Sequence, residues 1–238
     1  MCIRDRSNKP VSSIIGAQLP HTLQLTLLGL GWAIIVGIPL GCWSSIHPNS
    51  WIDRLAGVIS VSAIAVPSFI IAIYSLLLFT VTLRWFPAIG AGDKGDPWDQ
   101  LVHLVLPSFA ICLGWVGYLA RLVRASMLET MGENHIRMVR AYGLPSARIT
   151  YHYALKLAIL PTVALLGVGV GGLLSGAVFA EIVFARPGIG KLVYDAVMTR
   201  NYPIVMGGVL VTTILYAAST LISDLITAAL DPRVRANL

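Results

Sequence analysis

The sequence predicts an all-α integral membrane protein with about five transmembrane helices. Of its 238 residues, 56% are hydrophobic and only 12% are charged, about half the charged share of an average soluble domain. Five intervals contain no charged residue, and each exceeds the roughly 20 residues that a helix needs to cross a bilayer. These intervals are 10–52, 55–83, 100–120, 157–180 and 201–223.

We place the five spans near 21–43, 58–83, 102–122, 161–183 and 204–229. The first interval is too long for one helix, and Pro20, His21 and Pro48 limit its span to about 21–43. Pro67 lies inside the second span. Because proline lacks an N–H and its ring clashes with the preceding turn, it should kink that helix.

The fourth span contains two G-x-x-x-G pairs, Gly167 with Gly171 and Gly172 with Gly176. In lipid, helices gain little from burying apolar surface against each other, so close backbone approach and van der Waals contact must hold them together. We therefore expect this helix to pack tightly against another helix.

Positive charge indicates the orientation of the chain in the membrane. The loop 121–156 contains six basic residues and two acidic ones, which by the positive-inside rule places it in the cytoplasm and 84–99 outside. Alternation then places the N-terminus and 184–203 outside, and 44–57 and the C-terminus inside. Three basic residues on 184–203 oppose the rule, so we expect that loop to have packed structure of its own. An outside N-terminus would be natural if one earlier helix were missing.

The cytoplasmic loop has the pattern of two short helices joined by a tight turn. Ile136, Val139 and Tyr142 form an apolar stripe on a helix over 133–142. Gly143 is placed to end that helix in the left-handed conformation, and Pro145 fits the first turn of a second helix over about 146–157. The stripe could dock on a partner or lie on lipid headgroups, and the residues alone leave both open.

Several function classes find no support in the sequence. No charge lies centrally in a span, as a proton-coupled transporter would require. We expect no catalytic residue, metal site or cofactor, because the histidines are scattered and the three cysteines show no C-x-x-C spacing. Only Gly190-Lys191 matches part of a phosphate loop, so ATP should bind to another chain. The net charge of +6 reflects cytoplasmic loops rather than nucleic-acid binding.

The cytoplasmic loop resembles that of a known family. The run from His135 to Leu144 is similar to the "EAA" loop of ABC importer permeases in the form R-x-A-R-A-K-G-L, typical of the dipeptide/oligopeptide/nickel group. The hallmark glycine corresponds to Gly143, whereas Val139 and Tyr142 replace the usual Ala and Lys. The resemblance extends from about Pro20 to Arg235.

Further motifs of that family occur along the chain. They are Gly37-Ile38-Pro39-Leu40-Gly41, Val66-Pro67-Ser68-Phe69, Leu106-Pro107 followed by Ala120-Arg121, Arg124 and Leu128-Glu129, and Asp231-Pro232-Arg233. Another, E-x-x-F-x-x-P-G-x-G, is formed in the external loop by Glu181, Phe184, Pro187, Gly188 and Gly190. Asn201 stands where the family usually has Asp.

The resemblance implies the type I ABC importer transmembrane fold, with six helices of which the first is absent here. We interpret 1–6 as a sequence scar and 7–238 as a permease domain whose loop at about 125–157 docks on the ATPase. The docking residues that the resemblance implies are Arg137, Val139, Arg140, Ala141, Gly143 and Leu144.

The implied function is that of a multi-pass permease subunit in a bacterial plasma (inner) membrane, forming half of the pathway for peptides or a similar small solute. The implied partners are a second homologous permease, two ATP-binding subunits, an extracytoplasmic solute-binding protein and the lipid bilayer. The alternative is a secondary transporter or channel not coupled to ATP. The substrate, which could be a peptide, nickel, glutathione or another solute, and homo- or heterodimeric pairing stay open at this point.

Overall fold

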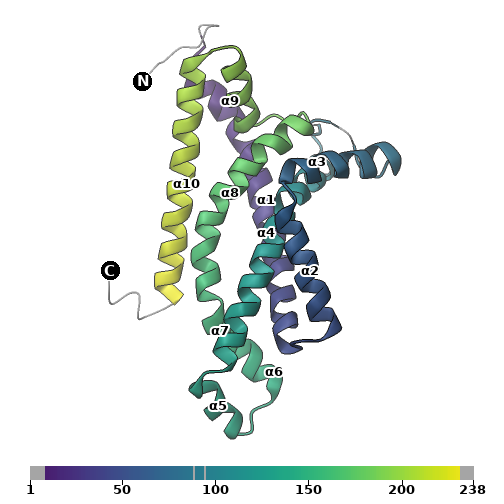
Figure 1. Ribbon diagram of the computed structural model, residues 1–238. Helices are drawn as coiled ribbons and strands as arrows, with labels where there is room; N and C mark the ends of the chain where they lie inside the picture. The colour runs from purple at the N-terminus through teal and green to yellow at the C-terminus, as the bar shows by residue number, and fades with distance from the viewer. Residues whose placement is uncertain (1–8, 88, 94, 231–238) are drawn as a thin grey trace. The chain divides into compact units, whose positions relative to one another are not determined.

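The computed structural model describes residues 9–87, 89–93 and 95–230, and every element in these ranges is a helix (Figure 1). The suspected scar at 1–6 and the terminal Asp231-Pro232-Arg233 lie outside them. In chain order the elements are α1 (Val11–Ile46), α2 (Trp51–Ala65), α3 (Ser68–Ser75), the π-helical η1 (Leu76–Thr82), α4 (Pro97–Met131), α5 (Asn134–Ala141), α6 (Ser146–Arg148), the π-helical η2 (Ile149–Ala154), α7 (Leu155–Ala158), α8 (Leu160–Val183), α9 (Ile189–Met198) and α10 (Tyr202–Leu230).

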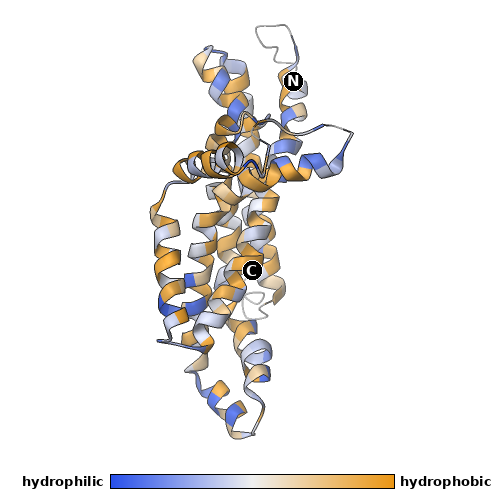
Figure 2. Cartoon of the chain, turned by 90° about the vertical axis from the view of Figure 1, so that its right-hand side faces the viewer, coloured by the Kyte–Doolittle hydropathy of each residue, from blue (hydrophilic) through white to orange (hydrophobic). Residues whose placement is uncertain are grey.

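The prediction of an all-α membrane fold is confirmed. Within the described residues, α1, α4, α8 and α10 are each long and apolar enough to cross a membrane, and α2 with α3 and η1 would form a fifth, broken span. Hydrophobic ribbon predominates along these helices (Figure 2). On α10 only 11% of the most apolar window is buried within the chain, as suits a helix whose remaining surface faces lipid or another subunit.

Three predicted spans differ from the observed helices, and the third, predicted over 102–122, is the longer α4 (Pro97–Met131). The first helix begins at Val11 rather than near residue 21, and Pro20 lies inside it. A proline inside a membrane helix removes one hydrogen bond, here to the Gly16 carbonyl, which neighbouring groups can compensate. In the second span Pro67 does more than kink the helix: α2 ends at Ala65, and Pro67 stands before α3 with extended backbone. The proline ring disfavours helical backbone at the residue before it, here Val66, and this accounts for the break.

The chain forms two compact units. One contains the chain up to Gly31, Val66–Leu113 and Gly169–Ala218, and the other contains Trp32–Ala65, Gly114–Val168 and the chain from Ser219. In the first unit, one apolar core joins the start of α1 to α9 and α10, and another joins α3 and α4 to the end of α8. In the second unit, the core lies where α1 and α4 end and the α5–α7 segment begins.

The glycine-rich helix α8 approaches α10 closely at two of the four glycines singled out above. A Cβ added at Gly167 would lie 2.5 Å from the Ser223 Cβ, and one at Gly171 would lie 2.7 Å from the Tyr216 ring. The Ser223 hydroxyl donates to the Val163 carbonyl at 2.5 Å, which adds an interhelical hydrogen bond. At Gly176 an added Cβ would make only ordinary contact, 3.4 Å from the Ser68 Oγ.

Candidate functional site: the α5–α6 loop and the α8–α9 junction

The loop between α4 and α8 turns sharply at Gly143. Helix α5 ends at Ala141, and the Gly143 N–H donates to the Arg140 carbonyl at 3.0 Å. Gly143 has a φ of +74°, in the left-handed region that the sequence predicted for it. Since an added Cβ would meet nothing within 4 Å, the turn requires glycine for its backbone conformation and not for space.

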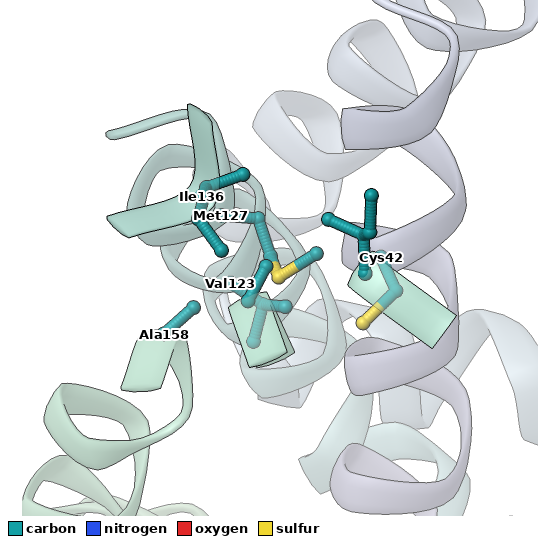
Figure 3. Close-up of a cluster of buried hydrophobic side chains, with 7 residues drawn as sticks. Cys42, Val123, Met127, Ile136 and Ala158 are labelled. Carbon is teal, nitrogen blue, oxygen red and sulfur yellow. The ribbon is translucent and has the colours of Figure 1, made fainter. Parts of the chain in front are cut away.

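Ile136 anchors this loop to the membrane helices. It is fully buried in a cluster with Cys42 of α1, Val123 and Met127 of α4, and Ala158 of α7 (Figure 3). Ile149 and Ala154 of η2 belong to the same cluster, and Val139 and Leu144 pack against its edge. The start of the loop is therefore packed onto the ends of α1 and α4.

The apolar stripe of Ile136, Val139 and Tyr142, predicted either to dock on a partner or to lie on lipid headgroups, does not form one exposed face. Ile136 is buried and Val139 is half-buried, whereas Tyr142 is 76% exposed. At about 100° per residue, Tyr142 lies some 120° around the helix from Ile136. The outward surface instead combines the exposed Met138 and Tyr142 with the exposed side chains of Arg137, Arg140, Ala141 and Arg148.

The second helix of the loop is less regular than predicted. The segment predicted as one helix over 146–157 consists of α6, η2 and α7. Pro145 does not lie in the first turn but stands just before α6, with φ −64° and ψ 141°. Its carbonyl accepts from the Arg148 and Ile149 N–H groups and so begins the helical segment.

An ion pair that the sequence patterns did not predict lies near the ends of α1 and α4. Arg124 donates to both carboxylate oxygens of Asp53, from Nε at 2.6 Å and from Nη2 at 2.7 Å. Asp53 also accepts from the Ser44 hydroxyl and, at 2.9 Å, from the Asn49 N–H. The Ser50 hydroxyl accepts from the Asp53 N–H at 3.1 Å. This network joins α1, α2 and α4 through one buried carboxylate, and the S-x-x-D spacing of Ser50 and Asp53 is the signal that could have drawn attention to it.

The external-loop motif surrounds the first turn of α9. Glu181, at the end of α8, is fully buried and accepts from the Thr22 hydroxyl at 2.7 Å and from the Lys191 N–H at 2.9 Å. The Thr22 hydroxyl in turn accepts from the Ile189 N–H at 2.8 Å. Because α9 has no side-chain cap of its own, Thr22 and Glu181 satisfy N–H groups that a helix start otherwise leaves free.

The other motif residues fit closely around Glu181. A Cβ added at Gly188 would collide with the Glu181 carboxylate, and one at Gly190 would lie 2.7 Å from the Val178 Cα. Phe184 is buried in the core of α3 and α4, and Pro187 is half-buried. The motif therefore forms a packed structural junction.

Arg186 is one of the three basic residues in the loop 184–203 that oppose the positive-inside rule, and its burial accounts for its presence there. It is only 1% exposed, and its Nη2 lies 3.5 Å from the Gln24 Oε1. Burial lowers the pKa of its guanidinium, and the nearby Glu181 carboxylate opposes that change. The loop 184–203 thus has the packed structure expected of it, including α9.

The comparisons with known proteins agree with this architecture. Residues 37–236 match the family model described as "Binding-protein-dependent transport system inner membrane component". The chain belongs to this family. It is therefore a multi-pass permease subunit of a bacterial inner-membrane ABC importer, and the alternative of a transporter or channel not coupled to ATP is not supported.

The curated relatives of this permease include subunits of dipeptide, oligopeptide and glutathione transport systems. It is 32% identical to the dipeptide transport system permease protein DppB of Alkalihalophilus pseudofirmus, over 97% of this chain and 75% of that protein. It is 33% identical to the glutathione transport system permease protein GsiC of Escherichia coli K12, over 96% and 72%. It is 32% identical to the oligopeptide permease AppB of Bacillus subtilis, over 96% and 73%.

Solved structures show the same fold. The permease is similar to a chain of the MetNI methionine ABC transporter in an inward-facing conformation, with a TM-score of 0.75 and 19% identity, covering 92% of this chain and 97% of that one. A chain of an amino acid ABC transporter gives a TM-score of 0.64 and 14% identity, covering 93% and 94%. These likenesses bear out the type I ABC importer fold.

Proposed function

We propose that this permease forms half of the translocation pathway for peptides or a similar small solute. Its partners would be a second homologous permease, two ATP-binding subunits and an extracytoplasmic solute-binding protein. Support comes from the curated relatives, which include dipeptide, oligopeptide and glutathione permeases. ATP hydrolysis would take place in the partner chains, and this subunit would convert it into movement of its helices.

The observation that carries the proposal is the construction of the α5–α6 loop. Its outer surface is basic and carries two exposed large side chains, Met138 and Tyr142, which are 58% and 76% exposed. Aromatic side chains and methionine are enriched at protein interfaces, and the arginines Arg137, Arg140 and Arg148 would favour an acidic groove. We assign this surface, including Ala141 and the turn at Gly143, to docking on the ATP-binding subunit.

Movement of a docked partner would reach the membrane through the buried side of the same loop. Ile136 contacts the cluster that contains Val123 of α4 and Cys42 of α1 (Figure 3). Densely packed side chains transmit displacement because they resist compression. A partner that pulls on Tyr142 would therefore move the ends of α1 and α4, while Val139 and Leu144 support the loop from its half-buried edge.

Coupled uptake in proteoliposomes tests the proposal. The assembled importer, with its binding protein and labelled dipeptide, should accumulate dipeptide only when ATP is supplied. Gly143→Val should lower dipeptide uptake per ATP hydrolysed by about tenfold or more, because left-handed backbone costs an L-residue about 1–2 kcal/mol and a β-branched one more. Gly143→Asn is the matched control, since asparagine tolerates this conformation and should keep most of the coupling. Wild-type coupling in Gly143→Val would contradict the assignment of the loop.

A further inference from the structure

We propose that Trp43 and Trp51, on either side of the turn between α1 and α2, contact lipid at the boundary between headgroups and acyl chains of the cytoplasmic leaflet (Figure 1). Their side chains are 56% and 75% exposed, and both lie in the same compact unit. Cys42, beside Trp43, packs in one cluster with Ile136 of the α5–α6 loop. The turn therefore lies on the side of the membrane where the positive charge of that loop places it. The proposal concerns lipid contact and does not depend on the solute or on ATP coupling.

The exposed face of α1 changes in character towards the turn. Trp32, Val36, Trp43 and Ile46 are all exposed, and at 100° per residue they lie within about 80° of one another around the helix. The polar residues of 47–50 follow directly. Along this face the order is thus apolar, then tryptophan, then polar, which matches the order of hydrocarbon, interface and water across one leaflet.

Helix α2 repeats the same order as it leaves the turn. It begins at Trp51, and its buried side is the narrow stripe Asp53, Ala56, Ser60 and Ala63. The large side chains beyond its first turn, such as Val58 at 63% exposure, point away from that stripe. An indole prefers the membrane interface because its ring is apolar and its N–H can donate to a headgroup. A contact with another protein would give no reason for a tryptophan beside the polar turn on both helices.

The charges near the turn complement the phosphates of a lipid surface. Arg54 in the first turn of α2 and Arg121 of α4 are both exposed. Arg121 lies at the same level, because its neighbour Ala120 has a carbonyl 2.6 Å from where a Cβ on Gly41 would stand. Asp53 is the one acidic residue in the sequence from 43 to 65, and it is buried in its ion pair with α4. Long basic side chains can lay their stems on apolar surface and extend their charge to the headgroups.

Photocrosslinking at a series of depths tests the proposal in membranes that contain the complete importer. Benzoylphenylalanine placed at Trp43 or Trp51 should form adducts with phospholipid, attached at the glycerol or the first acyl carbons, as mass spectrometry of the labelled chain would show. At Val58, seven residues further along α2, attachment should lie about 10 Å deeper along the acyl chain, since a helix rises 1.5 Å per residue.

His47 is the matched control, because it is exposed on the polar turn between the two tryptophans. The same amino acid at position 47 should react with the headgroup or not with lipid at all. Attachment at one depth from positions 47, 51 and 58 would overturn the proposal. Adducts of positions 43 and 51 with another subunit in place of phospholipid would also overturn it, and would show that this face is a protein interface.

Discussion

One carboxylate, Glu181, determines how α9 begins. Both of its oxygens accept hydrogen bonds, one from the Thr22 hydroxyl and one from the Lys191 N–H. In Glu181→Gln an amide NH₂ would face one of these donors, leaving a buried polar group unsatisfied. We expect a loss of about 1–3 kcal/mol of stability, seen as a lower midpoint of thermal unfolding in detergent micelles.

Thr22 provides the control for that prediction. Thr22→Ser keeps the hydroxyl that links Glu181 to the Ile189 N–H and should be close to wild type, whereas Thr22→Val should lose about as much stability as Glu181→Gln. An unchanged unfolding midpoint in both Glu181→Gln and Thr22→Val would show that the network does not support the fold. The sequence could identify Glu181 through its motif, but it could not identify Thr22, because the two residues are 159 positions apart.

In contrast to Thr22, the conformation of Gly143 could be predicted from the residues next to it in the sequence. A glycine that follows an amphipathic helical segment and precedes a proline is a strong signal for a left-handed turn, and φ at Gly143 is +74°. The periodicity that placed Ile136 and Tyr142 on one stripe predicted their environment less well. Hydrophobicity does not show whether a side chain is buried within its own chain or exposed for contact with a partner.

Among the elements, the contact between α8 and α10 depends on Gly167. A Cβ there would lie 2.5 Å from the Ser223 Cβ and 3.1 Å from the Thr220 Cα, so the two backbones would have to move apart. Gly167→Ala should therefore destabilise the permease by about 1–3 kcal/mol, despite the better helix propensity of alanine. Thermal unfolding of the purified protein measures this loss.

Gly176→Ala is the matched substitution on the same helix, since its Cβ would make only ordinary contact at 3.4 Å. It should be neutral or stabilising. If the two variants unfold at the same temperature, close packing at Gly167 does not contribute to stability. The G-x-x-x-G spacing could thus suggest that α8 packs closely, but it could not distinguish Gly167 from Gly176, because that depends on the neighbouring helix.

The Asp53–Arg124 pair joins α2 to α4, and a double-mutant cycle can measure its contribution to stability. Asp53→Asn and Arg124→Gln should each destabilise the permease, and the double variant should lose less than the sum of the two. We expect a coupling of about 0.5–3 kcal/mol, towards the lower part of that range because the Arg124 side chain is 33% exposed. Additive losses would mean that the two side chains stabilise the fold independently. This pair, 71 residues apart in sequence, could not be inferred from local patterns.

At the scale of the whole molecule, composition and charge-free intervals sufficed to predict an all-helical membrane protein with up to five spans. They could not predict that the helix breaks at Pro67 into α2 and α3, because the interval 55–83 is apolar and free of charge throughout. Nor could they show that Arg186 is buried; charge counting treats every arginine in a loop as exposed. These differences arise where tertiary contacts override the local sequence.

We propose above all that the ATP-binding subunit contacts this permease at Tyr142, at the exposed C-terminal end of α5. A photocrosslinking amino acid placed at Tyr142 tests it most directly, in membranes that contain the complete importer, with Met198 at the exposed end of α9 as the control position. We predict a covalent adduct between position 142 and the ATP-binding subunit, and none from position 198. An adduct of position 142 with phospholipid, or with the extracytoplasmic binding protein, would contradict the account.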